Sequence, residues 1–410
     1  MQTRSGRFSI MFVVFTALFC FGLYSTARSI LLQPISEDFS VSYTGSGLMF
    51  LISFLSVLLT NLAAGRLMQR FGMRVVYVAS IAGISLVLLV QSLAGDYLLF
   101  LASTFVLTLF TSGQNLAGNS IVATAFAGDG GARLNLMHVF YGLGSLAAPL
   151  FVALLASGGE PSVPHQLCAA ALQPEGASGG LDWRGIFVVL AILFGSVLFW
   201  YPFYRFRMQE SATVATGGAG FRHALADRHL LKITLAVLFA AGYEVSVSSW
   251  LVYTLEQGAG VSPAQAGLAI AVFFAGLAAG RASGSWLAKT GRLDSLLYPL
   301  AIVQALLAVS SLLFLEALPG LFALAGLTSS IFFPTLFYKV AQECHSSAAG
   351  AVYLTGAGLG VALFPFLVGV AGDLIGIRWA LVAAVICAIM LVPAIRSVLG
   401  NRSQSTGGAA

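Results

Sequence analysis

One acidic residue lies deep inside a long apolar stretch of this sequence. Glu244 stands about 15 residues beyond His229, where a polar segment ends, and at about 1.5 Å per helical residue this is roughly 20 Å along the stretch. An ionisable side chain at such a depth in a membrane costs at least about 2.5 kcal/mol, so it is expected to face a protein-lined cavity and to have a function. It could load and release a proton, or it could be the permanent partner of a basic residue.

Six neutral side chains with hydrogen-bonding groups lie in the same stretch and in two others. They could bind a small polar solute such as a sugar, which needs hydrogen bonds and an aromatic surface for the apolar side of its ring. The amides could instead join helices, at about 0.6 kcal/mol each, and the aromatic rings could form a belt at the membrane surface. Two of the aromatic residues, three positions apart, are expected to share a helix face. The candidates are Gln114, Asn115, Asn119, Tyr141, Trp250 and Tyr253.

Two arginines lie within apolar stretches. Arg28 could bind a carboxylate or phosphate through two parallel hydrogen bonds, or its long side chain could extend to the membrane surface. Pairing of Arg28 with Glu244 is a further hypothesis, in which protonation of Glu244 would release Arg28 to a substrate. Arg281 lies near the end of a later stretch, and we assign it to a structural gate rather than to substrate contact.

Membrane-spanning helices must position these side chains. The chain is 58% hydrophobic and 9% charged, against about 25% charged residues in a typical soluble protein. A span needs about 20 mostly apolar residues. The sequence therefore predicts an all-α membrane protein with twelve spans, at about 8–33, 45–64, 73–95, 98–124, 134–157, 184–204, 231–255, 263–286, 294–315, 318–339, 348–371 and 378–398.

The basic residues outside the spans gather on one side of this predicted topology. Only Arg184 and Arg378 are expected on the other side. The richer side is cytoplasmic by the positive-inside rule, so both termini are expected in the cytoplasm. The short loops and compact tails favour a bacterial inner membrane. The net charge of +5 therefore indicates topology and not nucleic-acid binding.

Enzyme motifs are missing from the sequence. It has no HExxH zinc motif and no Walker A loop. The cysteines have no metal-ligand spacing. We therefore expect no enzymatic activity, no cofactor and no metal, and a monomer whose partners are the lipid bilayer, a small-molecule substrate and a coupling ion, H⁺ or Na⁺.

The two halves of the sequence repeat each other. Gly22 to Ser42 aligns with Gly242 to Ser262 at an offset of 220 residues, and the pattern Gly-x-Gly-x4-Pro at Gly142 recurs at Gly358 at an offset of 216. Parallel repeats of this kind are a known plan of transporters, with the substrate site at their interface. We predict a first half at 1–204, a cytoplasmic linker at 205–230 and a second half at 231–410, related by a pseudo-twofold axis along the membrane normal.

A motif between the second and third spans identifies a family resemblance. The sequence from Gly65 to Arg74, GRLMQRFGMR, resembles the G-x-x-x-D-R-x-G-x-[RK] signature of the major facilitator superfamily, with Gln69 in place of the acid. In that family the acid is thought to latch the outward-facing state, so the latch here must be weaker or rely on neutral hydrogen bonds. The resemblance implies gating roles for Gly65, Gln69, Arg70, Gly72 and Arg74, and for Arg281, Lys289 and Gly291 in the second copy.

Within this superfamily, the fifth and seventh spans look most like the branch of sugar carriers that includes fucose–proton symporters. The paired acids that those symporters carry in spans one and four have no counterpart here. The resemblance implies a secondary active transporter for a small polar solute, and we assign coupling to Glu244 because it is an acid deep inside an apolar stretch. The alternatives are an organic-anion carrier or drug exporter of the same fold, and a transporter-like sensor or assembly partner that moves nothing.

Overall fold

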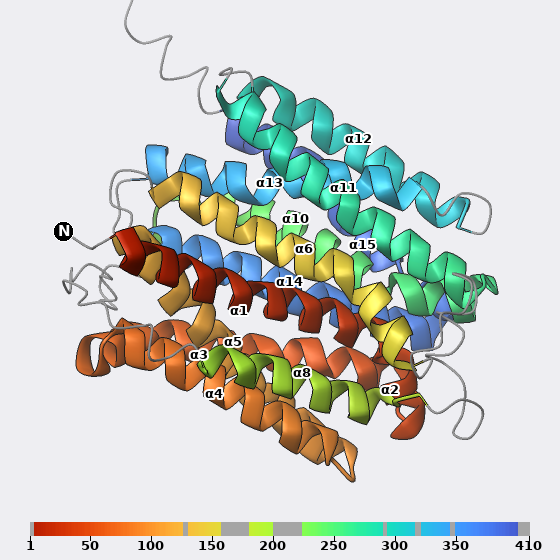
Figure 1. The fold of residues 1–410 in the computed structure, drawn as a ribbon. Coiled ribbons are helices and arrows are strands. Elements are labelled where there is room, and N and C mark those ends of the chain that lie inside the picture. Colours follow the sequence, from red (N-terminus) through yellow and green to blue (C-terminus); the bar gives the residue numbers. More distant parts are fainter. Residues whose placement is uncertain are drawn as a thin grey trace, which may run out of the picture. The chain divides into compact units, whose positions relative to one another are not determined.

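The computed structural model describes residues 4–125, 130–156, 180–199, 224–289, 293–315, 321–344 and 349–400. Figure 1 shows that the elements in these ranges are helices. Ten of them are long and apolar enough to cross a membrane. Together with the shorter apolar helix α8 and with α13, they correspond one to one with the twelve predicted spans, so the predicted all-α membrane fold is confirmed.

The helices have the following bounds. The first half of the sequence forms α1 (Arg4–Ile30), the short α2 (Leu32–Asp38), α3 (Tyr43–Phe71), α4 (Met73–Ser92), α5 (Tyr97–Ala125), α6 (Gly130–Ala156) and α8 (Trp183–Leu198). The second half forms α10 (Arg228–Tyr253), α11 (Pro263–Lys289), α12 (Leu293–Leu313), α13 (Leu321–Glu343), α14 (Ala349–Ile375) and α15 (Val382–Leu399). A π-helical turn, Thr254–Gly258, extends α10, and a 3₁₀ turn, Ile377–Trp379, precedes α15.

The chain folds as two compact units. The first contains Met1–Ser40 and Leu55–Val214, and the second contains Val41–Phe54 and Ala215–Ala410. The start of α3 therefore groups with the second unit although it belongs to the first half of the sequence. The proposed linker at 205–230 stays a prediction, because residues 200–223 lie outside the described ranges.

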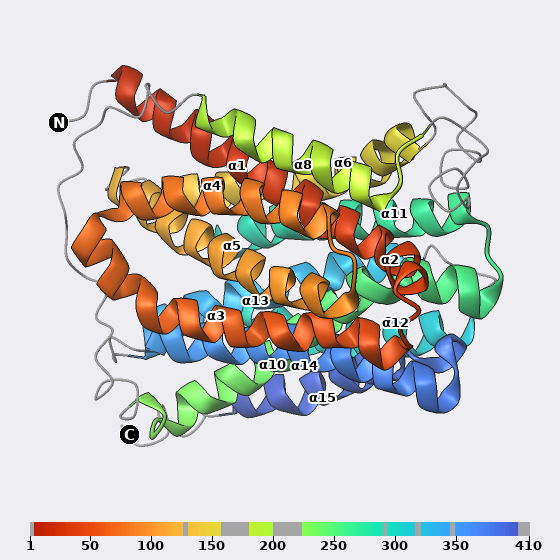
Figure 2. The ribbon, with the colours of Figure 1, turned by 90° about the horizontal axis from the view of Figure 1, so that it is seen from below.

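The same helix pairings build both units. In the first unit α1 packs along α6, and α4 packs along α5 and α8 (Figure 2). In the second unit the corresponding pairs are α10 with α14 and α12 with α13 and α15. The repeat that the sequence predicts is thus present in the packing of each unit taken by itself.

Glycines bring the two main helix pairs into close contact. A Cβ atom on Gly144 of α6 would lie 2.0 Å from the carbonyl oxygen of Phe19. One on Gly360 of α14 would lie 2.1 Å from the carbonyl oxygen of Leu238. Only glycine allows backbones to approach this closely. The helices are therefore in close contact at Gly144 and Gly360 but not at Gly142, where an added Cβ would meet no atom within 4 Å.

A buried glutamine–threonine pair joins two helices inside each unit. The Gln91 side chain on α4 donates to the Thr104 hydroxyl on α5 at 2.7 Å. In the second unit the Thr328 hydroxyl on α13 donates to the Gln304 amide oxygen on α12. Such bonds satisfy polar groups that a lipid environment cannot hydrate.

Candidate functional site

Glu244 forms an ion pair with Arg281 inside the second unit. Helix α10 begins at Asp227, whose carboxylate accepts hydrogen bonds from the backbone N–H groups of His229 and Leu230. This start places Glu244 in the middle of the helix. Its Oε1 atom lies 3.2 Å from Nη2 of Arg281 on α11, so the carboxylate has a cationic partner at mid-helix depth.

The pair is only partly buried. The Glu244 side chain keeps 20% of its surface exposed and the Arg281 side chain 31%. Protein atoms therefore enclose neither side chain completely, and protonation of the carboxylate would remove the charge that holds the guanidinium. The sequence interpretation assigned Arg281 to a gate, but the structure places it against Glu244. Neither spacing nor periodicity could reveal this partner, because it lies 37 residues away on another helix.

Trp250 and Tyr253 pack against each other on α10. Their ring centroids are 6.0 Å apart and their planes differ by 9°, which confirms that they share a helix face. The indole N–H of Trp250 donates to the carbonyl oxygen of Pro365 at 2.9 Å, and the ring is fully buried. Both rings therefore contribute to the packing of α10 with α14, and contact with a substrate stays a prediction.

The predicted amides lie together on α5 in the first unit. The Asn119 side chain donates to the carbonyl oxygen of Asn115 at 2.8 Å, and the Asn115 side chain to that of Thr111 at 3.4 Å. Gln114 is 2% exposed, and its side-chain oxygen has no hydrogen-bond partner within the described part of the chain. Buried polar groups are nearly always paired. The Gln114 oxygen is therefore an acceptor that a bound donor could satisfy.

Tyr141 and Arg28 lie on the neighbouring pair α1 and α6 of the same unit. The Tyr141 hydroxyl donates to the Ser25 hydroxyl at 3.4 Å. The guanidinium carbon of Arg28 lies 5.9 Å from the centre of the Tyr24 ring. Because Arg28 and Glu244 belong to different units, their proposed pairing stays a prediction.

The loop motif forms a sharp turn between α3 and α4. Gly72 has a φ angle of 82° and is the one residue between the two helices, a conformation that side chains other than glycine rarely adopt. Arg70 lies over the Phe71 ring at 5.3 Å. Of the other predicted gating residues, Gly65 and Gln69 lie on α3, Arg74 lies on α4, Lys289 ends α11, and Gly291 lies outside the described residues.

A second charged cluster joins the start of α10 to the end of α13. Glu343 accepts from Lys339 at 3.0 Å and lies 2.7 Å from Nε2 of His229. Burial acts to raise the pKa of the Glu343 carboxyl, but the hydrogen bonds and charges of His229 and Lys339 outweigh burial and hold this pKa below its ordinary value. The sequence interpretation missed this cluster, although the Lys339–Glu343 spacing of four residues is a helical ion-pair signal.

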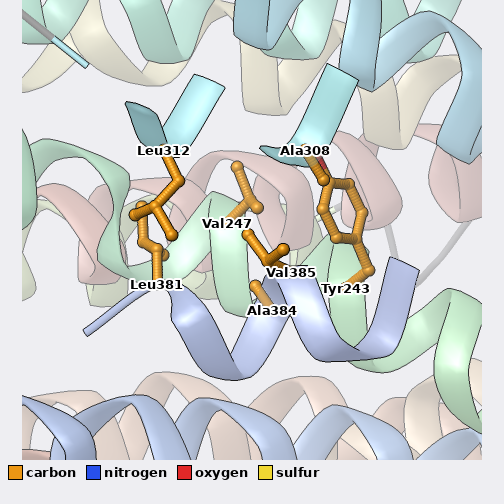
Figure 3. Close-up of a pocket in the computed structure, with 7 residues that line it drawn as sticks. All are labelled: Tyr243, Val247, Ala308, Leu312, Leu381, Ala384 and Val385. Carbon is orange, nitrogen blue, oxygen red and sulfur yellow. The ribbon is translucent and has the colours of Figure 1, made fainter. Parts of the chain in front are cut away.

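A small cavity lies beside Tyr243, the neighbour of Glu244 (Figure 3). Its volume of about 10 Å³ gives room for about one water molecule. It is too small for a sugar and is not the candidate site. The lining residues are Tyr243, Val247, Ala308, Leu312, Leu381, Ala384 and Val385.

The apolar helices of the described residues, folded as two units, are those of an integral membrane protein. The model of the Major Facilitator Superfamily matches residues 13–353, and the chain belongs to this family. The chain is 28% identical over 397 residues to a glucose/galactose transporter of Brucella abortus biovar 1 (strain 9-941), an alignment covering 94% of this chain and 92% of that one. Its fold and relatives are those of transporters and not of enzymes.

Solved structures of other transporters share the fold. A bacterial homolog of the human lysosomal transporter Spinster, inward-facing and unoccupied, matches 97% of this chain and 99% of its own at a TM-score of 0.76 and 16% identity. The fucose:proton symporter FucP of E. coli matches 95% of this chain and 98% of its own at a TM-score of 0.65 and 19% identity. The predicted resemblance to the superfamily is confirmed by the family match, and the likeness to the fucose symporter is one of fold.

Proposed function

We propose that this protein is a secondary active transporter that takes up a hexose together with a proton by alternating access. The observation that carries the proposal is the Glu244–Arg281 ion pair, which joins the middle of α10 to the last third of α11. The names of the relatives supply the substrate class, since the curated relative from Brucella is a glucose/galactose transporter.

In the proposed mechanism, protonation of Glu244 determines whether Arg281 can donate hydrogen bonds to the sugar. The ionised carboxylate holds the guanidinium at 3.2 Å. When the carboxyl group takes up a proton, this attraction is lost and Arg281 can donate hydrogen bonds to sugar hydroxyl groups. Release of the sugar and of the proton on the other side restores the pair. Sugar and proton thereby bind to the same state of the carrier, which is the requirement for coupling.

The amides of α5 supply the proposed hydrogen bonds to the sugar. Gln114 offers a buried acceptor, and Asn115 and Asn119 lie one helical turn apart. Tyr141 and Arg28 on the adjacent helix pair, and Trp250 and Tyr253 on α10, complete the proposed set.

The proposal includes the topology. The halves at 1–204 and 231–410 rock about the site, and 205–230 links them in the cytoplasm together with both termini. We place the carrier, as a monomer, in a bacterial inner membrane. The residues of the loop motif act as its cytoplasmic gate.

Uptake into proteoliposomes tests the proposal. Glucose, galactose and fucose would be offered with an inward pH gradient and separately with an inward Na⁺ gradient. We expect one of these sugars to accumulate under the pH gradient. Glu244→Gln should abolish accumulation while equilibrium exchange of the sugar persists.

Glu343→Gln is the matched control, because it removes another paired acid that lies at a helix end, and it should still accumulate sugar. Accumulation driven by the Na⁺ gradient alone would mean that the coupling ion is Na⁺ and not H⁺. If no sugar moves, or if Glu244→Gln accumulates sugar like the wild type, the sugar–proton proposal is wrong and an organic-anion carrier becomes the first alternative to test.

A further inference from the structure

The first turn of α3 is held by a carboxylate from the far end of the sequence. The backbone N–H of Tyr43 donates to Oδ1 of Asp373 at 3.1 Å, and that of Thr44 donates to Oδ2 at 2.8 Å. The first N–H groups of a helix have no partner within it and carry partial positive charge, so a carboxylate there forms charge-assisted hydrogen bonds. Asp373, near the end of α14, therefore caps a helix that begins 330 residues earlier.

Glycines on α14 make room for this contact. A Cβ on Gly369 would lie 2.3 Å from the carbonyl oxygen of Tyr43, and one on Gly372 would lie 3.1 Å from the Tyr43 side chain. The Tyr43 ring also meets the Tyr253 ring edge to face, with centroids 5.4 Å apart. The start of α3 thus packs closely against α14 and α10.

Helix α3 is shared between the two units. Residues up to Phe54 group with the second unit, and residues from Leu55 group with the first. Beyond that point the Ser56 hydroxyl donates to the carbonyl oxygen of Phe105 on α5 at 2.8 Å. One continuous helix is therefore held by different units at its two ends. If the units rock against each other, either the contact of α3 with Asp373 or its contact with α5 must break.

The corresponding helix of the second unit lacks such a contact among the described residues. Both helices have a local serine cap: the backbone N–H of Gly45 donates to the Ser42 hydroxyl at 3.2 Å in α3, and that of Gln265 donates to the Ser262 hydroxyl at 3.4 Å in α11, the repeat of α3. At the repeat offset of 216 residues, Asp373 corresponds to Ser157. Within the described ranges, the carboxylate cap is thus found at the start of α3, in the second unit, and not at the start of α11. The loop motif at the other end of α3 carries the neutral Gln69 where its family has an acid.

We propose that Tyr43, Thr44 and Asp373 form an outer latch that keeps the carrier closed on the side of the α3 N-terminus, and that release of Asp373 is a step in opening that side. The inference rests on the proposed alternating-access function. In this inference the Asp373 carboxylate favours the state that is closed on the side of the α3 N-terminus. The neutral Gln69 offers no comparable charge at the opposite end of α3.

Hydrogen–deuterium exchange of the full-length protein in nanodiscs tests the latch without any sugar. Asp373→Asn removes the charge but keeps one acceptor, and Asp373→Ala removes both. We expect exchange in peptides over residues 41–54 to rise about 10-fold in the alanine variant and less in the asparagine variant. Because an open outer side requires a closed inner side, exchange over residues 66–74 at the other end of α3 should fall in both.

Asp96→Asn is the matched control. Asp96 also caps a helix with its side chain, accepting from the backbone N–H of Leu99 at 2.8 Å, but the cap is local to α5. Its loss should loosen only the first turn of α5. If exchange rises over residues 41–54 but does not fall over residues 66–74, Asp373 is only a structural cap and the latch proposal is wrong. Unchanged exchange in both segments would also contradict the proposal. A failure of sugar uptake would leave this readout intact, so the two proposals fail separately.

Discussion

The helix pairs of the first unit have direct counterparts in the second, whereas the polar side chains deep inside the two units differ in kind. In the first unit the candidates on α5 are neutral amides, with Asn115 and Asn119 bonded to backbone carbonyl groups of their own helix. In the second unit, by contrast, α10 and α11 carry the Glu244–Arg281 ion pair. Packing has been kept between the repeats while the chemistry has diverged.

This difference suits the two units to different roles in the proposed transport. A neutral amide keeps its hydrogen-bonding capacity at any pH, so the first unit is suited to constant recognition of a polar solute. An acid beside a guanidinium changes its charge with proton uptake, so the second unit is suited to coupling. Four experiments test this comparison.

The ion pair should show the largest effect. Arg281→Gln leaves the carboxylate of Glu244 without its cation and should lower stability by about 1–3 kcal/mol. The double variant Glu244→Gln with Arg281→Gln should recover most of that loss, because no unpaired charge remains. Thermal unfolding in detergent at pH 7 measures both. Additive losses in the double variant would contradict a direct interaction between the two side chains.

The amides of α5 should affect binding and not coupling. Asn115→Ala and Asn119→Ala should each weaken sugar binding by about 5- to 10-fold, equivalent to one hydrogen bond of about 1 kcal/mol. The ratio of protons to sugar should not change. Equilibrium binding of labelled sugar and pH-driven uptake measure the two quantities. Ser120→Ala, one position further along the same helix, serves as the control; a comparable loss there would remove the case for the amides.

The cluster at Glu343 should affect stability in a pH-dependent way and leave transport intact. The pKa of Glu343 lies below its ordinary value of 4.5, so its contribution is fully present above about pH 4.5 and is lost as the pH falls through the lower folded value. Glu343→Gln should therefore lose about 1 kcal/mol at pH 7, and the difference from wild type should shrink in more acidic buffer. A constant difference across this pH range would show that Glu343 acts by packing alone.

The glutamine–threonine pairs should show the smallest effect, equal in the two units. Gln304→Leu removes the bond to Thr328, and Gln91→Leu removes the bond to Thr104 together with a long one, of 3.5 Å, to the carbonyl oxygen of Phe100. Such an interhelical hydrogen bond is worth about 0.6 kcal/mol in membrane proteins. Thermal unfolding of the two variants should give similar small shifts. A much larger loss in one of them would show that the repeat does not extend to the polar contacts between α4 and α5 and between α12 and α13.

Local sequence patterns were sufficient for the helices and for some site residues. Hydropathy alone placed the twelve spans, because each span must be apolar over its whole length to leave water. The motif from Gly65 to Arg74 marked the turn at Gly72, where only glycine suits the backbone. Glu244 was found because an acid in an apolar stretch is costly wherever its helix faces.

Contacts between helices were decided by the tertiary structure. The sequence fixes how deep Glu244 lies along α10, but its partner depends on how α10 and α11 are rotated and packed, and this brings Arg281 to 3.2 Å. Packing in the same way directs the Trp250 N–H to Pro365 and the Asp373 carboxylate to the first turn of α3. Depth is a property of one helix and can be counted along the chain, whereas a side-chain partner is a property of two helices and exists only once they have packed.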